Sequence, residues 1–259
     1  MQYGVCGGPE IGGVAAEAGY DYFEWSVGAL LKPRESKEAF HESLEAVRNA
    51  PLPCPVLNCF IPEDLKITGP DADLRALEQY ATVTLRRAEE AGVEVIVFGS
   101  GGSRRIPDGF DRQAALRQIV DFCRMLAPIA RRYGVTVAIE PLNRADCNVL
   151  NTVGECAAIV REVDHPSLRL LVDSYHWAKD NDSLQDIATH GDLLSHVHIA
   201  TVPNRLPPGA ERCELAPFFE ALREAGYHGR ASIEAKIPDP MHDLTIALFI
   251  MTSLAKEAG

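Results

Sequence analysis

The sequence predicts an α/β fold, a single (β/α)8 TIM barrel that spans residues 1–259 as one domain. Its length of 259 residues is close to the ~250 typical of such a barrel. Short apolar runs alternate with longer amphipathic segments, which is typical of β-α units that build a parallel sheet. Runs such as VTVAIE and LRLLVD are apolar almost throughout, as expected of strands that helices cover on the outside.

Eight strands are predicted where β-branched and apolar residues cluster. In chain order they cover residues 3–6, 22–26, 55–60, 93–98, 135–140, 168–173, 194–199 and 231–234. Helices are expected between them, near residues 9–18, 36–49, 71–91, 110–133, 153–162, 182–190, 214–225 and 240–257.

Two of the helices have clear signals. From Leu74 to Ala88 the apolar residues recur at three- and four-residue steps, and Gly92 stands where a helix C-cap belongs. The helix that begins near Phe110 ends in RRYG, which places positive charge at the negative end of the helix dipole. The segment 202–212 is rich in turn residues, so we interpret it as an insertion over the mouth of the barrel.

Composition narrows the choice of partners and location. A formal net charge of −12 disfavours nucleic acid and anionic membrane surfaces. The first residues lack a basic and apolar leader pattern, and no later run reaches the ~18 apolar residues of a membrane span, so a cytoplasmic protein is expected. The seven cysteines are odd in number and contain no C-x-x-C pair, which favours reduced thiols.

Four successive strands near the end of the chain each finish in a potential metal ligand. These residues are Glu140, Asp173, His198 and Glu234. Because the carboxyl ends of parallel barrel strands open on one face, we expect the four side chains to converge. Three carboxylates and one imidazole suit one divalent ion, Mn²⁺ or Mg²⁺ in the first place and Co²⁺ or Zn²⁺ as alternatives.

Any one of these residues could instead cap a helix or pair with an arginine, and for a single residue that is the more common role. Four in succession change the balance. Burying three acids close together without a cation is costly, so a bound metal ion explains the whole set best.

The motifs IEPLNR, VDSYH and HVHI, the glutamate of the last strand and AGYDYFEW near the start resemble the xylose-isomerase-like barrel superfamily. The resemblance is to its branch of ketose 3-epimerases, hydroxypyruvate isomerases and inosose dehydratases, and runs along most of the chain. It implies that Glu140 and Glu234 are both metal ligands and the catalytic acid/base pair. It further implies that Asp173 and His198 are ligands only, and that His176 hydrogen-bonds substrate oxygens beside the metal.

Other candidate substrate-binding residues follow the same comparison less closely. Ketose 3-epimerases have a glutamate six residues after the first metal glutamate and an arginine six after the metal histidine. Here these places hold Asp146 and Asn204, with Arg205 one residue further. Either Asp146 and Arg205 do the same work with shifted reach, or the pocket accepts another polyol or keto-sugar.

Three further positions complete the expected surroundings of the site. Glu24 ends the second strand and is expected to line the sugar pocket by hydrogen bonding, whereas His196 is expected to pack one layer below His198. Lys236, two residues past Glu234, is a candidate for holding an anion, and the glycine-rich run at 99–105 is a weaker one, with solvated arginines as its plainer interpretation.

The resulting hypothesis is a metal-dependent isomerase or epimerase of carbohydrate metabolism that moves a proton beside a carbonyl through an enediolate, with a small sugar or keto-polyol as substrate. Alternatives are an inosose dehydratase-like lyase, a DNA-repair enzyme like endonuclease IV, and a non-catalytic sugar-binding barrel. The endonuclease is disfavoured because its extra zinc histidines have no counterpart after strands three, four and seven. The sugar, the reacting carbon, the native metal and the presence of a homo-oligomer stay open.

Overall fold

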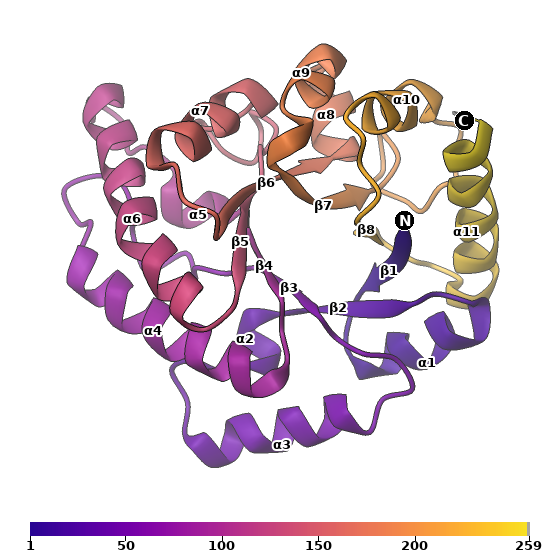
Figure 1. The fold of residues 1–259 in the computed structure, drawn as a ribbon, viewed down its shortest axis with the longest axis horizontal. Coiled ribbons are helices and arrows are strands. Elements are labelled where there is room, and N and C mark those ends of the chain that lie inside the picture. Colours follow the sequence, from indigo (N-terminus) through magenta and orange to yellow (C-terminus); the bar gives the residue numbers. More distant parts are fainter. Residues whose placement is uncertain (258–259) are drawn as a thin grey trace.

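The computed structural model describes residues 1–257 and contains a closed barrel of parallel strands in the order β1 to β8. Strand β1 (Gln2–Cys6) pairs with β8 (Arg230–Ile233), which closes the ring. Figure 1 shows the strands at the centre and the helices arranged around them. The other strands are β2 (Tyr22–Ser26), β3 (Val56–Asn58), β4 (Val95–Phe98), β5 (Thr136–Ile139), β6 (Leu168–Asp173) and β7 (Leu194–Ile199). The predicted TIM barrel is confirmed.

The predicted helices are also present. They are α1 (Pro9–Ala18), α3 (Lys37–Arg48), α4 (Leu74–Ala91), α6 (Arg112–Arg132), α7 (Val153–Val163), α9 (Leu184–Thr189), α10 (Ala216–Glu224) and α11 (Pro240–Glu257). Four short elements were not predicted: α2 (Val27–Leu30), α5 (Gly101–Arg104), α8 (Ser174–Asp180) and the 3-10 turn η1 (Gly191–Leu193). With one or two turns each, they are too short for a helical period to show in the sequence. None of the helices within residues 1–257 combines the length and apolar character needed to cross a membrane.

The helix ends follow local chemistry. Asp111 caps α6, since its Oδ1 accepts a hydrogen bond from the backbone N–H of Ala114 at 2.8 Å. Gly92 ends α4 with a φ of 73°, a left-handed conformation that glycine adopts without steric cost. These caps set where each helix stops, and so where the chain turns back to the next strand.

The barrel interior is a packed core of its own. Its buried side chains come from β2 to β6 and are Tyr22, Val56, Val95, Val97, Ala138 and Leu171. A larger apolar cluster fills the space between strands and helices. Above this filled interior the carboxyl ends of the strands form the mouth, where a site can be built on rigid backbone.

Candidate metal and substrate site

The four predicted ligands meet at the carboxyl end of the barrel. Asp173 closes β6, His198 lies near the end of β7, and Glu140 and Glu234 directly follow β5 and β8. Each offers one ligand atom, and these atoms all lie within 4.8 Å of one another. His198 Nδ1 is 3.2 Å from Glu140 Oε1 and 3.1 Å from Glu234 Oε2. The spacing of strand ends along the sequence therefore does become a cluster in space.

Several carboxylates surround the imidazole of His198. Burial alone would lower the pKa of His198, but Glu24, Glu234 and Glu140 outweigh it and raise that pKa well above its ordinary value. Burial also raises the pKa of Glu140. Three carboxylates and a nitrogen at this spacing fit a hard divalent cation, whose charge would offset their mutual repulsion. The type and spacing of these four ligand atoms are therefore compatible with a bound divalent metal ion.

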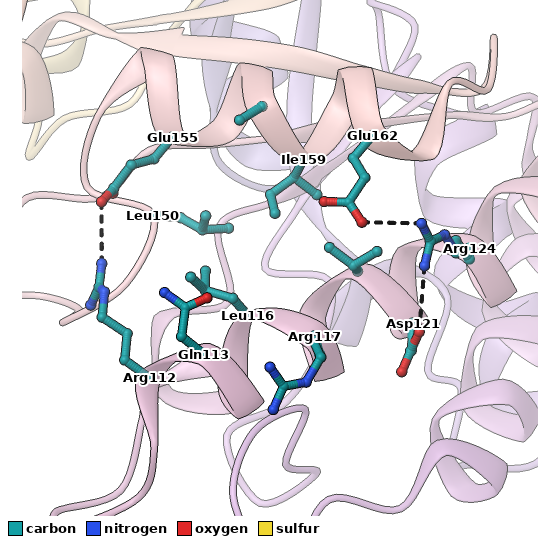
Figure 2. A pocket seen from close by; sticks show the side chains of 12 residues that line it. Arg112, Gln113, Leu116, Arg117, Asp121, Arg124, Leu150, Glu155, Ile159 and Glu162 are labelled. Carbon is teal, nitrogen blue, oxygen red and sulfur yellow. Dashed lines mark hydrogen bonds and ion pairs between the residues drawn. The ribbon is translucent and has the colours of Figure 1, made fainter.

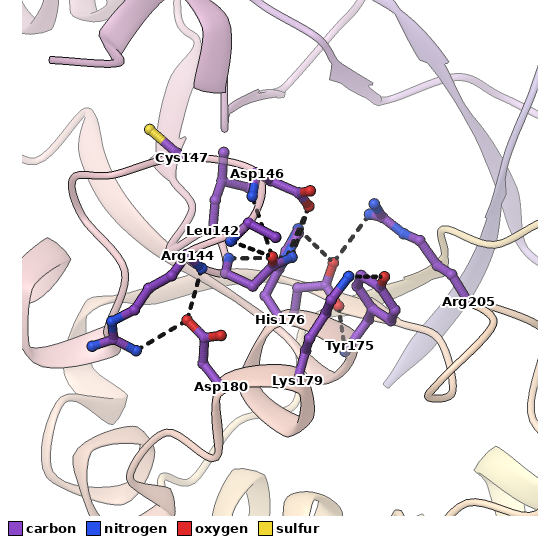
Figure 3. A network of polar contacts seen from close by, with 12 residues as sticks. Leu142, Arg144, Asp146, Cys147, Tyr175, His176, Lys179, Asp180 and Arg205 are labelled. Atoms are coloured by element: carbon purple, nitrogen blue, oxygen red, sulfur yellow. Dashed lines mark hydrogen bonds and ion pairs between the residues drawn. The ribbon is translucent and has the colours of Figure 1, made fainter. Parts of the chain in front are cut away.

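His176 stands beside the ligands in a defined tautomer. Its Nδ1 accepts hydrogen bonds from the backbone N–H of Asn143 at 3.2 Å and from that residue's side-chain amide at 2.7 Å. The proton of the neutral ring therefore sits on Nε2, which lies 3.6 Å from Asp173 Oδ2. Figure 3 shows this network around His176. The ring can donate one hydrogen bond toward a molecule bound at the cluster.

Arg205 reaches the cluster from the loop at residues 202–212. Its Nη2 lies 2.5 Å from Glu234 Oε2 and 3.4 Å from Asp173 Oδ2, and its guanidinium stacks 4.9 Å from the centre of the Tyr175 ring. Arg205 has a left-handed backbone conformation with a φ of 57°, and the neighbouring Asn204 donates from Nδ2 to Glu211. Arg205, one residue beyond the position expected from the resemblance, therefore lines the mouth of the barrel, whereas Asn204 does not.

The pocket at the mouth has a volume of about 290 Å³. We call it the mouth pocket; it is lined by Asn58, Cys59, Gly99, Ser100, Gly101, Gly102, Glu140, Leu142, Asp146, His176, Arg205 and Glu234. Asp146 is therefore a wall residue, with Oδ2 accepting from Asn143 Nδ2 at 2.7 Å. Three carboxylates, one imidazole and one guanidinium line the pocket, and these groups can hydrogen-bond a hydroxylated ligand.

Two predicted substrate contacts, Glu24 and Lys236, do not line the mouth pocket. Glu24 is fully buried and lies beneath the cluster, with its oxygens 2.9 Å from Nε2 of both His196 and His198. In this position Glu24 faces the two imidazoles rather than the mouth pocket. Lys236 is exposed and does not line that pocket. The reason is that β8 ends at Ile233, so the alternation of a strand no longer fixes which side Lys236 faces.

Sequence reasoning missed or misread three supporting positions. Asn143 fixes the tautomer of His176, as described above. Gly99 permits close approach of the glutamate, because a Cβ there would lie 2.3 Å from Glu140 Oε2. Arg104 is not solvated but fully buried, and its guanidinium donates to the carbonyl oxygens of Phe98 at 3.1 Å and Glu140 at 2.7 Å. Of these three positions, only Gly99 has a signal in the sequence. It is a glycine directly after β4, and the neighbouring strand β5 is followed by the predicted ligand Glu140.

A second hollow lies on the outer wall between α6 and α7, with a volume of about 500 Å³ (Figure 2). Arg112 pairs with Glu155 at 3.2 Å and Arg124 with Glu162 at 3.0 Å across it. Its floor is apolar, with Leu116 and Ile159 among its residues. It holds none of the clustered ligands, two of which, Glu140 and Glu234, line the smaller mouth pocket.

The chain is similar in sequence to several sugar epimerases. The chain is 31% identical over 175 residues to 3-dehydro-D-guloside 4-epimerase of Escherichia coli, covering 63% of this chain and 64% of that protein. It is 28% identical over 249 residues to L-ribulose 3-epimerase of a Methylomonas species, covering 91% and 82% of the two chains. The matched part of D-psicose 3-epimerase of Ruminiclostridium cellulolyticum is 58% of its length, at 29% identity and 65% of this chain.

Solved structures share the fold. The apo structure of 3-keto-D-glucoside 4-epimerase from E. coli superposes with a TM-score of 0.78 at 26% identity, covering 98% of this chain and 99% of that one. A D-psicose 3-epimerase with D-tagatose gives 0.80 at 21% identity, covering 100% and 96%. A family model described as xylose isomerase-like TIM barrel matches residues 13–249. The chain therefore belongs to the xylose isomerase-like TIM barrel family.

Proposed function

We propose that this chain is a divalent-metal-dependent sugar epimerase, which removes and returns a proton at a carbon next to a carbonyl group. One observation carries the proposal: Glu140 and Glu234 both contact His198 Nδ1 while Asp173 completes the set within 4.8 Å. Two carboxylates at one small polar pocket can serve as base and acid. Several relatives are named as sugar 3- or 4-epimerases, which supports the same reaction class.

The four residues of the cluster would be the ligands of the ion: Glu140, Asp173, His198 and Glu234. When bound, the ion supplies positive charge that stabilises the negative charge developing on substrate oxygens. Glu140 and Glu234 would exchange the proton with the substrate carbon, one from each face. His176 would donate its Nε2–H to a substrate oxygen, and Arg205 and Asp146 would orient hydroxyl groups.

The charges around the mouth pocket favour a neutral substrate. Glu140, Asp146 and Glu234 line it, and the guanidinium of Arg205 is already paired with Glu234 and Asp173. Lys236, the predicted anion contact, is exposed outside the pocket. Even with a divalent ion at the cluster, a phosphate or carboxylate would add negative charge beside these acids while Arg205 is already paired, so an unmodified ketose or keto-glycoside is the proposed substrate class.

Solvent deuterium tests the reaction. The Mn²⁺-loaded protein is incubated in D₂O with D-fructose, L-ribulose, a 3-keto-glucoside and hydroxypyruvate, and products are examined by NMR. An epimerase places deuterium on the inverted carbon of a ketose or keto-glycoside. Inversion without deuterium, or no turnover of any of these sugars, would contradict the proposal.

An aldose–ketose isomerase is the second candidate, because another relative, from Xenopus laevis, is a putative hydroxypyruvate isomerase, 30% identical over 158 residues. In that reaction the proton returns to the adjacent carbon, which was the carbonyl carbon. The position of the deuterium in the same experiment therefore separates the two reactions.

A further inference from the structure

Below the ligand cluster lies a buried carboxylate that the proposed proton transfer does not use. Glu24 is at the inward side of β2, and its side chain is fully buried, as are those of His196 and His198. Glu24 Oε1 is 2.9 Å from His198 Nε2, and Oε2 is 2.9 Å from His196 Nε2. An anion this deep in the barrel requires donors, and the two imidazoles are placed to provide them.

The contact fixes the tautomer of His198. A carboxylate accepts hydrogen bonds, so Nε2 of His198 must carry the proton that points at Glu24. The other nitrogen, Nδ1, faces Glu140 and Glu234 at 3.2 and 3.1 Å, so it is the nitrogen that would lose its proton and offer its lone pair to a bound ion. Rotating the ring to present Nε2 to the cluster would break the bond to Glu24.

His196 completes the support. Its Nε2 faces Glu24 Oε2 and lies 3.3 Å from Ser232 Oγ, which in turn is 2.9 Å from the hydroxyl of Tyr22. The two imidazole rings meet nearly edge to face, with ring centres 5.1 Å apart. These contacts hold both carboxylate oxygens of Glu24 in place, so the carboxylate cannot swing away from His198.

We propose that Glu24 is a positioning residue for the metal site: with His196 as its second donor, it holds His198 so that Nδ1 faces the ion. This inference rests on metal binding in the proposed function. Acceptors behind a metal-bound histidine commonly change metal affinity by 10–100-fold, so Glu24→Gln should weaken Mn²⁺ binding by about that factor. Glutamine keeps the size of the side chain but loses the charge and one acceptor oxygen.

The experiment measures Mn²⁺ affinity by competition with a chromophoric chelator, together with the melting temperature of the metal-free protein. Tyr20→Phe is the matched control: it removes a buried hydroxyl that donates to the backbone carbonyl of Leu244 in α11 and has no part in the network around Glu24. We expect wild type and Tyr20→Phe to bind Mn²⁺ alike and Glu24→Gln to bind it more weakly. Equal affinity of all three would overturn the positioning role and leave the proposed function standing; absence of binding to wild type would overturn both.

A second measurement needs no variant of Glu24. In Zn²⁺-loaded wild-type protein with ¹⁵N-labelled histidine, long-range ¹H–¹⁵N spectra report which nitrogen of each ring is protonated. The proposal requires His198, assigned by the loss of its signals in His198→Gln, to keep the proton on Nε2 and coordinate through Nδ1. Coordination through Nε2 would overturn it. So would two ions per chain, because Cys6, Glu24 and His198 also converge within 4.8 Å and Glu24 would then be a ligand.

Discussion

Arg205 and Glu234 form an ion pair of 2.5 Å inside the mouth pocket, so a guanidinium and a metal ion would share the same carboxylate. Burial alone would lower the pKa of Arg205, but Glu234 and Asp173 raise it, so the side chain stays charged. Its positive charge therefore opposes that of a metal ion, while its N–H groups are available to substrate hydroxyls.

Replacing Arg205 with methionine should have opposite effects on metal and on turnover. Without the competing charge, Mn²⁺ should bind about tenfold more tightly. Loss of charged hydrogen bonds to the substrate should lower kcat/KM by about tenfold to a hundredfold. Chelator competition and initial rates measure the two quantities. Arg144→Met, which removes an exposed pair with Asp180, is the control; weaker Mn²⁺ binding by Arg205→Met would contradict the competition.

Gly99→Ala should damage the site without unfolding the barrel. The new Cβ would lie 2.3 Å from Glu140 Oε2, so the carboxylate has to move away from the cluster. Such crowding typically costs about 1–3 kcal/mol, and here it falls on metal binding, which should weaken by at least about tenfold. Gly13→Ala is the control, because nothing lies within 4 Å of its Cβ. Equal Mn²⁺ affinity of the two variants, by titration calorimetry, would rule out the close-approach role.

His176→Phe tests the substrate contact separately from the metal. Phenylalanine keeps a ring in place but removes the Nε2–H that points toward Asp173 and the pocket. We expect kcat/KM to fall by about tenfold to a hundredfold while Mn²⁺ affinity stays within about twofold of wild type. Steady-state kinetics with metal occupancy measured alongside decides this, and unchanged kinetics would remove His176 from the substrate site.

The sequence carries the fold and the ligand cluster because both depend on periodic signals. Apolar runs mark the strands, and in a closed parallel barrel the residues that end β5 to β8 share one face. Strand alternation no longer predicts the direction of a side chain once the strand has ended. Lys236 lies beyond Ile233, the last residue of β8, and its backbone N–H donates to the carbonyl oxygen of Arg205, so its direction is set by a loop.

Burial of charge was the harder problem. Glu24 and Arg104 are fully buried. The sequence does not show that two imidazoles contact the carboxylate of Glu24, or that Arg104 donates to backbone carbonyl oxygens. Apart from Phe98, which is close to Arg104 in the sequence, these partners come from distant parts of the chain, and only the closed barrel brings them together. A charged residue at a strand end therefore points to the mouth region, but not to which side of the ligands it lies.

Metal binding should strengthen as pH rises, because His198 must lose its proton to coordinate. In the metal-free protein, Glu24, Glu234 and Glu140 outweigh burial and raise the pKa of His198 above 6.5. A raised pKa contributes stability that is fully present below 6.5 and is lost as pH rises through the folded-state pKa. The gap in melting temperature between Mn²⁺-loaded and metal-free protein should therefore widen from about pH 6 to about pH 9. A constant gap, measured by differential scanning calorimetry, would contradict proton competition.

The two glutamates should separate ligand roles from proton transfer. Glu140→Gln and Glu234→Gln keep the side-chain size but can neither accept nor deliver the proton, so turnover at full Mn²⁺ occupancy should fall by about 10²–10⁴. In a two-base epimerase, each variant should still exchange the proton of one epimer with D₂O without completing inversion, and the two variants should act on opposite epimers. Occupancy is measured first, because both residues are in the cluster. A single-base isomerase would instead keep activity in one of the variants. If both keep full activity with metal bound, Glu140 and Glu234 are ligands only, and the proton is moved by another group.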